Sequence, residues 1–248
     1  MKLKYLLLLI TIYASSCSEI KQNSSPTATD YKKMYQNAIE NSIYPKQSKV
    51  SKNLISINDK NQKLIRKNIK GEEHILFLAW KDKQVVDDFY RPKLNTALNT
   101  GVYPIWVTSS NELKDWFKKN QVKDTVMRLK QLLGLPPTAT NSHFVEFWVK
   151  QKNLFRPCPD KEIMDNRCNC NFLDNVDEDH KKWINENRVS RYYNMDLYNQ
   201  YPWTQLGYTY DWSAKNESHI GLSEFIIDQN AIVYIKKIYT TSQYLHSK

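Results

Sequence analysis

Aromatic side chains gather in one short stretch near the C-terminal end of the chain. Segment 201–212 contains five aromatic residues in twelve positions. Aromatic rings supply large contact areas at a small entropic cost, and nearby hydroxyl and carboxylate groups suit sugars, peptides or apolar ligands. These residue types give five ligand-binding candidates: Trp203, Tyr208, Tyr210, Asp211 and Trp212. The alternative is a core strand, because Tyr208, Tyr210 and Trp212 alternate and share one face of an extended segment.

Acid–base chemistry is a second interpretation of the same region. His219 and Glu224 follow the aromatic segment, and a histidine oriented by a carboxylate is one element of hydrolase active sites. Cys158 is a further candidate, as a nucleophile paired with His219. The other histidine to test is His143. Because closeness in sequence does not establish catalytic geometry, the sequence leaves open whether the protein is an enzyme.

The first seventeen residues predict export. Lys2 and Lys4 precede an apolar run at 5–13, which is too short to span a bilayer as a helix, and small residues follow at 14–16. Residues 14–17, Ala-Ser-Ser-Cys, resemble the lipobox of bacterial lipoproteins. The resemblance implies cleavage before Cys17, acylation of Cys17 by palmitate-type chains, and attachment of the protein to a membrane. The alternative is an ordinary signal peptide that is cut nearby.

Three further cysteines lie within thirteen residues of one another. Thiols outside the cytoplasm tend to be oxidised, so we expect one disulfide from Cys158 to Cys168 or to Cys170. A bond between Cys168 and Cys170 would close a very small, strained ring. A zinc site that adds His143 or His180 is the alternative, but the cysteine spacing does not match the usual paired-ligand patterns. We therefore expect neither a metal nor a cofactor.

Composition narrows the classes of partner. The 248 residues carry a formal net charge of +10, but the lysines are spread along the chain and export disfavours nucleic acid. With only five glycines, repetitive turn-rich architectures such as propellers are disfavoured.

We expect a signal peptide at 1–16, a lipidated cysteine and flexible tether at 17–30, and one globular domain at 31–248.

Hydrophobic periodicity predicts an α+β domain with a mixed or antiparallel sheet and packed helices. Strands are expected at 54–57, 74–80, 102–108 and 143–149, helices at 31–42, 110–118, 122–133 and 177–188, and a closing hairpin at 222–227 and 231–239. Irregular structure is expected at 154–179, which is rich in Pro, Cys, Asn and Asp.

The C-terminal half also resembles an uncharacterised family of bacterial exported proteins. The residues that carry this resemblance are 128–137, 144–148, 154–160, 202–212 and 221–225. The family implies no activity. The function that we expect is a lipid-anchored binding or accessory module of the cell envelope, on the periplasmic side or at the cell surface, with a glycan, a peptide or an envelope protein as ligand. The alternative is an envelope hydrolase that uses His219 with Glu224, or Cys158.

Overall fold

Two of the predicted strands, at 74–80 and 143–149, form the centre of the sheet. Strand β2 (Glu72–Asp82) pairs antiparallel with β5 (Asn141–Val149), with Phe77 opposite Phe147. Seven consecutive residues of β2, from His74 to Trp80, are buried. A strand that is covered on both faces is apolar throughout rather than at alternate positions, which explains the continuous apolar run at 75–80.

The computed structural model describes residues 25–120, 122, 124–192 and 196–246. Its main sheet has eight strands in the order β3-β10-β5-β2-β4-β9-β6, with β1 beside β2, and neighbouring strands pair antiparallel. The other strands of this sheet are β1 (Arg66–Ile69), β3 (Ala97–Asn99), β4 (Ile105–Ser109), β6 (Leu154–Phe155), β9 (Phe225–Ile227) and β10 (Ile232–Thr240). Strands β7 (Tyr208–Tyr210) and β8 (Ile220–Ser223) form a separate pair.

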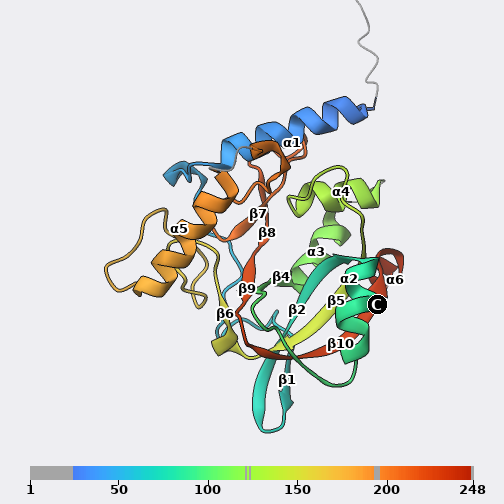
Figure 1. The fold of residues 1–248 in the computed structure, drawn as a ribbon, viewed down its shortest axis with the longest axis vertical. Coiled ribbons are helices and arrows are strands. Elements are labelled where there is room, and N and C mark those ends of the chain that lie inside the picture. The colour runs from blue at the N-terminus through green and yellow to red at the C-terminus, as the bar shows by residue number, and fades with distance from the viewer. Residues whose placement is uncertain (1–24, 121, 123, 193–195, 247–248) are drawn as a thin grey trace, which may run out of the picture.

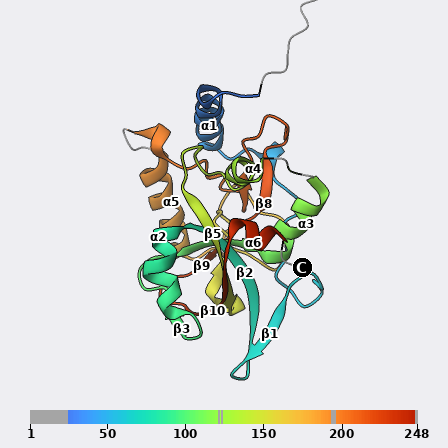
Figure 2. The same ribbon diagram turned by 90° about the vertical axis from the view of Figure 1, so that its right-hand side faces the viewer.

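Helices surround the sheet, and this confirms the predicted α+β class (Figure 1). They are α1 (Ala28–Ser42), α2 (Lys83–Val85), α3 (Ser110–Asn120), α4 (Thr125–Leu132), α5 (Glu178–Tyr192) and α6 (Thr241–His246). Figures 1 and 2 both place α1 at the end of the molecule opposite the hairpin of β1 and β2. In the described ranges, no helix combines the length and the apolar character needed to cross a membrane.

The two faces of the sheet belong to different hydrophobic clusters. On one face, Phe77 of β2 packs with Phe147 of β5 and with Phe225 of β9. On the other face, Leu78 and Trp80 pack against helices α3, α4 and α6. Side chains of a strand alternate between its two faces, so consecutive residues of β2 enter different clusters.

A third cluster joins α1 and α5 to the aromatic segment 201–212. Tyr35 and Ile39 of α1 and Ile184 of α5 pack around Trp203 and Trp212. Helix α1 starts with a capping box in which Thr27 and Asp30 bond reciprocally. Buried residues recur along one stripe of α1, as the periodicity predicts, so this helix covers the aromatic segment.

Three predicted elements differ in the structure. No strand forms at 54–57, where the backbone instead bonds to Asn166 and Ile163 of the irregular loop. Helix α4 is shorter than predicted, because Asp124 caps it and it begins at Thr125. The predicted closing hairpin is wrong: β9 pairs with β4 and β6, while β10 pairs with β3 and β5. The turn between them is held by residues around Thr100, so the chain crosses to a different part of the sheet.

Candidate functional site

An aromatic cavity opens where two neighbouring strands separate. Strands β2 and β4 pair at Phe77–Ser109 and Leu78–Thr108, and beyond these pairs a cavity of about 340 Å³ lies between the end of β2 and the start of β4. Segment 201–210 closes its far side. The rings in its lining are Trp80, Trp106, Phe144, Tyr201, Trp203 and Tyr210. This volume lies in the range of small-molecule sites, roughly 300–1,000 Å³.

The rings around the cavity are fixed by contacts outside it. Trp203 donates from Nε1 to the carbonyl oxygen of Pro157 at 2.9 Å, and Trp80 donates to Oγ1 of Thr241 at 2.9 Å. Trp106 meets Trp203 edge to face, with ring centroids 6.3 Å apart. Because Trp203 and Trp80 already have their polar partners and Trp106 is packed against Trp203, these walls of the cavity are formed before any ligand arrives.

Arg191 brings a positive charge to this aromatic surface from the last turn of α5. Its guanidinium carbon lies 4.8 Å from the ring centroid of Trp106 and 5.9 Å from that of Trp203. Its buried Nε has no hydrogen-bond partner within the described part of the chain. Burial lowers the pKa of Arg191, although an arginine stays charged at neutral pH. The two indoles therefore hold a cation at the cavity by cation–π contacts.

Glu224 lines the same cavity from the bend between β8 and β9. Its backbone N–H donates to the carbonyl oxygen of Gly207 at 2.9 Å, which fixes the bend. Burial raises the pKa of the Glu224 carboxyl to about 8, although the charge of Arg191 acts in the opposite direction. At neutral pH this carboxyl is therefore mostly protonated and uncharged. Among the described residues, no ion pair joins it to Arg191.

The neighbouring Ser223 is held by a buried carboxylate on α3. Glu112 accepts hydrogen bonds from the backbone N–H of Ser223 at 3.0 Å and from its hydroxyl at 2.9 Å. Burial raises the pKa of Glu112 to about 7. The Ser223 hydroxyl in turn accepts from the N–H of Ile55 at 2.7 Å. Glu112 thus positions Glu224 through the backbone, while Glu224 itself lines the cavity.

Lys81 adds a second amine-bearing side chain, from the end of β2. It lines the cavity, and its ammonium makes no hydrogen bond or ion pair with the residues that the structure describes. Burial lowers the pKa of Lys81 to about 8, so the group is still mostly protonated at pH 7. One aromatic cavity is therefore lined by three ionisable side chains from distant parts of the sequence: Lys81, Arg191 and Glu224.

The ligand-binding candidates from the sequence divide into two groups. Trp203 and Tyr210 line the cavity. Tyr208, Asp211 and Trp212 are buried elsewhere: the Tyr208 hydroxyl donates to the carbonyl oxygen of Lys49, and Trp212 Nε1 donates to that of Leu135. Tyr208 also lies in a different cluster from Tyr210 and Trp212.

Asp211 belongs to a buried ion pair. It is fully buried and accepts two hydrogen bonds from Arg128, at 2.8 and 2.5 Å, one from Asn216 at 2.8 Å and one from the backbone N–H of Ser213 at 3.1 Å. Both carboxylate oxygens are therefore engaged inside the protein. The cavity has Glu224 as the one carboxylate in its described lining.

The hydrolase candidates are not brought together. His219 stacks on Tyr210 with ring centroids 5.0 Å apart, and it lines a separate cavity of about 270 Å³ with Tyr208. Glu224 lines the first cavity and is not part of the second. The remaining histidine, His143, bonds to the hydroxyl of Ser142 at 2.9 Å, outside both.

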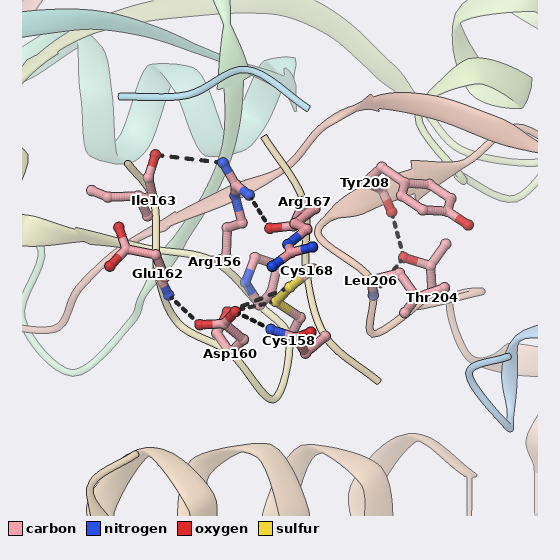
Figure 3. Close-up of a disulfide and its surroundings, with 12 residues drawn as sticks. Arg156, Cys158, Asp160, Glu162, Ile163, Arg167, Cys168, Thr204, Leu206 and Tyr208 are labelled. Carbon is pink, nitrogen blue, oxygen red and sulfur yellow. Dashed lines mark hydrogen bonds between the residues drawn. A yellow bond between two sulfur atoms is a disulfide. The ribbon is translucent and has the colours of Figure 1, made fainter. Parts of the chain in front are cut away.

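The predicted disulfide is confirmed, and it joins Cys158 to Cys168 (Figure 3). Cys170 is a free, half-buried thiol. Because the Cys158 sulfur is held in the disulfide, it offers no thiolate, and the proposed nucleophilic role of Cys158 is wrong for this form of the protein. His180 bonds through Nε2 to the carbonyl oxygen of Cys158. In the described ranges, no group of three or more His, Cys, Asp or Glu side chains is placed to hold a metal ion.

Three residues on which the cavity depends were not among the candidates selected from the sequence: Lys81, Trp106 and Arg191. Lys81 directly follows the apolar run 74–80, and Arg191 occupies the last turn of a polar helix. Each is an ordinary surface residue by its local pattern. The one local signal for a role of Lys81 in the cavity is its position at the end of a buried strand. There the apolar stem of a lysine lies along the core while its charged end extends beyond it.

Replacement of Glu224 by Gln is expected to change how stability depends on pH. The folded-state pKa of Glu224 is about 8 and its ordinary value is 4.5, so between these values the folded state holds a proton that the unfolded state has lost. Stability therefore falls as pH rises through this window, by up to about 1.4 kcal/mol per pH unit. Gln does not titrate. In urea unfolding at pH 5, 6, 7 and 8, the free energy of unfolding of the variant relative to that of the wild type should therefore increase as pH rises.

The matched control is Glu217→Gln, which removes an exposed carboxyl seven residues away and should leave the slope unchanged. Glu112 contributes a slope of the same sign below pH 7, but it is present in both proteins and cancels in the comparison. A constant difference between the Glu224→Gln variant and the wild type across this range would show that the carboxyl is not protonated by burial.

Comparisons of the chain with protein-family models, with curated proteins and with solved structures found no match.

Proposed function

We propose that the protein is a lipid-anchored binding module of the bacterial cell envelope. Its leader and the lipobox-like residues before Cys17 support export and anchoring, although these residues lie outside the described part of the structure. The ligand is a small, mainly apolar molecule that occupies the cavity between β2, β4 and segment 201–210. A tethered domain of this kind holds its cavity close to a membrane surface.

One observation carries the binding proposal: the cavity has fixed aromatic walls. Apolar and aromatic linings with a few polar groups are typical of small-molecule sites. Trp106 is half-buried in a central strand and contributes to the lining, so part of its ring stays exposed although Arg191 lies against it. A ligand ring would cover that surface and gain both hydrophobic burial and ring stacking.

The proposal is tested by a titration with N-phenyl-1-naphthylamine, an uncharged probe whose fluorescence rises in apolar sites. The protein is the mature chain with Cys17→Ser, so that no detergent is needed. The wild-type domain should bind the probe with saturable fluorescence. Trp106→Leu should weaken binding at least tenfold, because aromatic residues at the centre of a site contribute most of the binding free energy.

Trp116→Leu is the control, since Trp116 is also half-buried but lies on α3 outside the cavity. Its affinity for the probe should stay within twofold of the wild type. Thermal melts of both variants separate loss of binding from loss of fold. Absence of saturable binding to the wild type, or equal effects of the two substitutions in folded protein, would refute the proposal.

A further inference from the structure

The charges of the cavity are unbalanced. Two cationic side chains, Lys81 and Arg191, line the cavity, whereas Glu224 is the one carboxylate in the described lining. Burial raises the pKa of that carboxyl and so favours its uncharged form. A site of small volume with apolar walls and an excess of positive charge favours an anion, because charges interact strongly where water is limited.

We infer that the ligand of this cavity is a small apolar acid, whose carboxylate pairs with Arg191 and is attracted by the charge of Lys81, while its apolar body packs against Trp106 and Trp203. This inference rests on the ligand-binding function proposed above. It names the chemical class of the ligand and the two side chains that favour it.

The geometry of Arg191 supports recognition of a carboxylate. Its guanidinium carbon lies 4.8 Å from the ring centroid of Trp106 and 5.9 Å from that of Trp203, which holds the group beside the two rings. A guanidinium supported by rings on its face presents its N–H groups at its edges, where a carboxylate accepts two parallel hydrogen bonds. Among the described residues, Arg191 forms no ion pair or hydrogen bond with a carboxylate.

Lys81 lines the cavity from a different element. It extends from the end of β2, whereas Arg191 extends from α5, and both line the same cavity. A lysine ammonium is a compact charge with three donors, so it adds attraction without a fixed geometry. In its protonated form, Glu224 does not repel the ligand and has a hydroxyl that donates a further hydrogen bond.

The test compares 2-naphthoate with 2-naphthamide, which have the same shape but differ in charge. Each is used to displace N-phenyl-1-naphthylamine from the mature Cys17→Ser chain at pH 7. The wild type should bind 2-naphthoate at least tenfold more tightly than 2-naphthamide. Arg191→Gln should abolish most of this preference, while the affinities for the amide and for the uncharged probe change by less than threefold.

Lys81→Met provides a second variant, which decides the question if Arg191→Gln does not fold. Lys182→Gln is the control, because it removes one positive charge from an exposed position on the same helix. That control should keep the full preference for 2-naphthoate over 2-naphthamide. A loss of this preference that is confined to Arg191→Gln and Lys81→Met supports the inference.

Two results would overturn the inference and leave the binding function standing. One is equal affinity of the wild type for the acid and the amide while the uncharged probe binds. The other is a preference for the acid that survives in both cavity variants. If the uncharged probe itself does not bind the wild type, the proposed function fails, and this inference fails with it.

Discussion

The Asp211→Ala variant is expected to lose about 3–5 kcal/mol of unfolding free energy, because it leaves a buried charge network without its anion. Asp211 is fully buried and holds Arg128, Asn216 and the N–H of Ser213. Arg128 is itself mostly buried, with its guanidinium 4.5 Å from the ring centroid of Trp116. Removal of the carboxylate therefore leaves a cation and two other donors without an acceptor.

Urea unfolding measures this loss, and Asp115→Ala on the exposed face of α3 is the control, with an expected change below about 0.5 kcal/mol. The experiment also decides between two roles for Asp211. A stable Asp211→Ala variant that no longer binds ligand would restore Asp211 as a binding residue and contradict its structural role.

Arg156→Met should be more damaging still, with an expected loss of at least about 4 kcal/mol, because each buried acceptor that is left unsatisfied costs about 1–3 kcal/mol. Arg156 is fully buried beside the disulfide (Figure 3). Its guanidinium donates to the carbonyl oxygens of Ile55 at 2.9 Å, Asp165 at 2.6 Å and Arg167 at 2.6 Å. It thereby joins the irregular loop that carries the disulfide to the segment before β1.

Met keeps an apolar stem in place of the Arg stem but lacks the guanidinium, so the variant removes the hydrogen bonds together with the packing of that group. Arg156→Lys keeps the charge but lacks the planar fork of donors, and an intermediate loss is expected. Denaturant unfolding of the oxidised protein provides the measurement. A loss below 1 kcal/mol for Arg156→Met would show that water replaces the guanidinium and that the loop is held mainly by its disulfide.

Local patterns predicted the elements whose periodicity is long and regular. The continuous apolar run at 74–80 became the central part of β2, and the stripe on 31–42 became the buried face of α1. The hairpin prediction failed because a strand, a turn and a second strand are also compatible with a connection that crosses to another part of the same sheet. The partners of that turn, around Thr100, lie more than one hundred residues away in sequence.

The same limit applies to the candidate site. Of the aromatic residues selected from 201–212 as binding candidates, Trp203 and Tyr210 line the cavity, whereas Tyr208 and Trp212 are buried outside it. Alternation along a strand does not show which face is buried when both faces are covered. The contributions of Lys81 and Arg191 depend on the separation of β2 from β4, which is a tertiary feature with no local signal.

The most direct test of the account is a crystal structure of the protein with 6-bromo-2-naphthoate, in which the anomalous signal of bromine locates the ligand. The account predicts a bromine peak inside the cavity, the naphthyl rings against Trp106 and Trp203, and the carboxylate within hydrogen-bond distance of Arg191. A bromine peak confined to another site, such as the cavity of Tyr208 and His219, would contradict it, as would a carboxylate that points away from both Arg191 and Lys81.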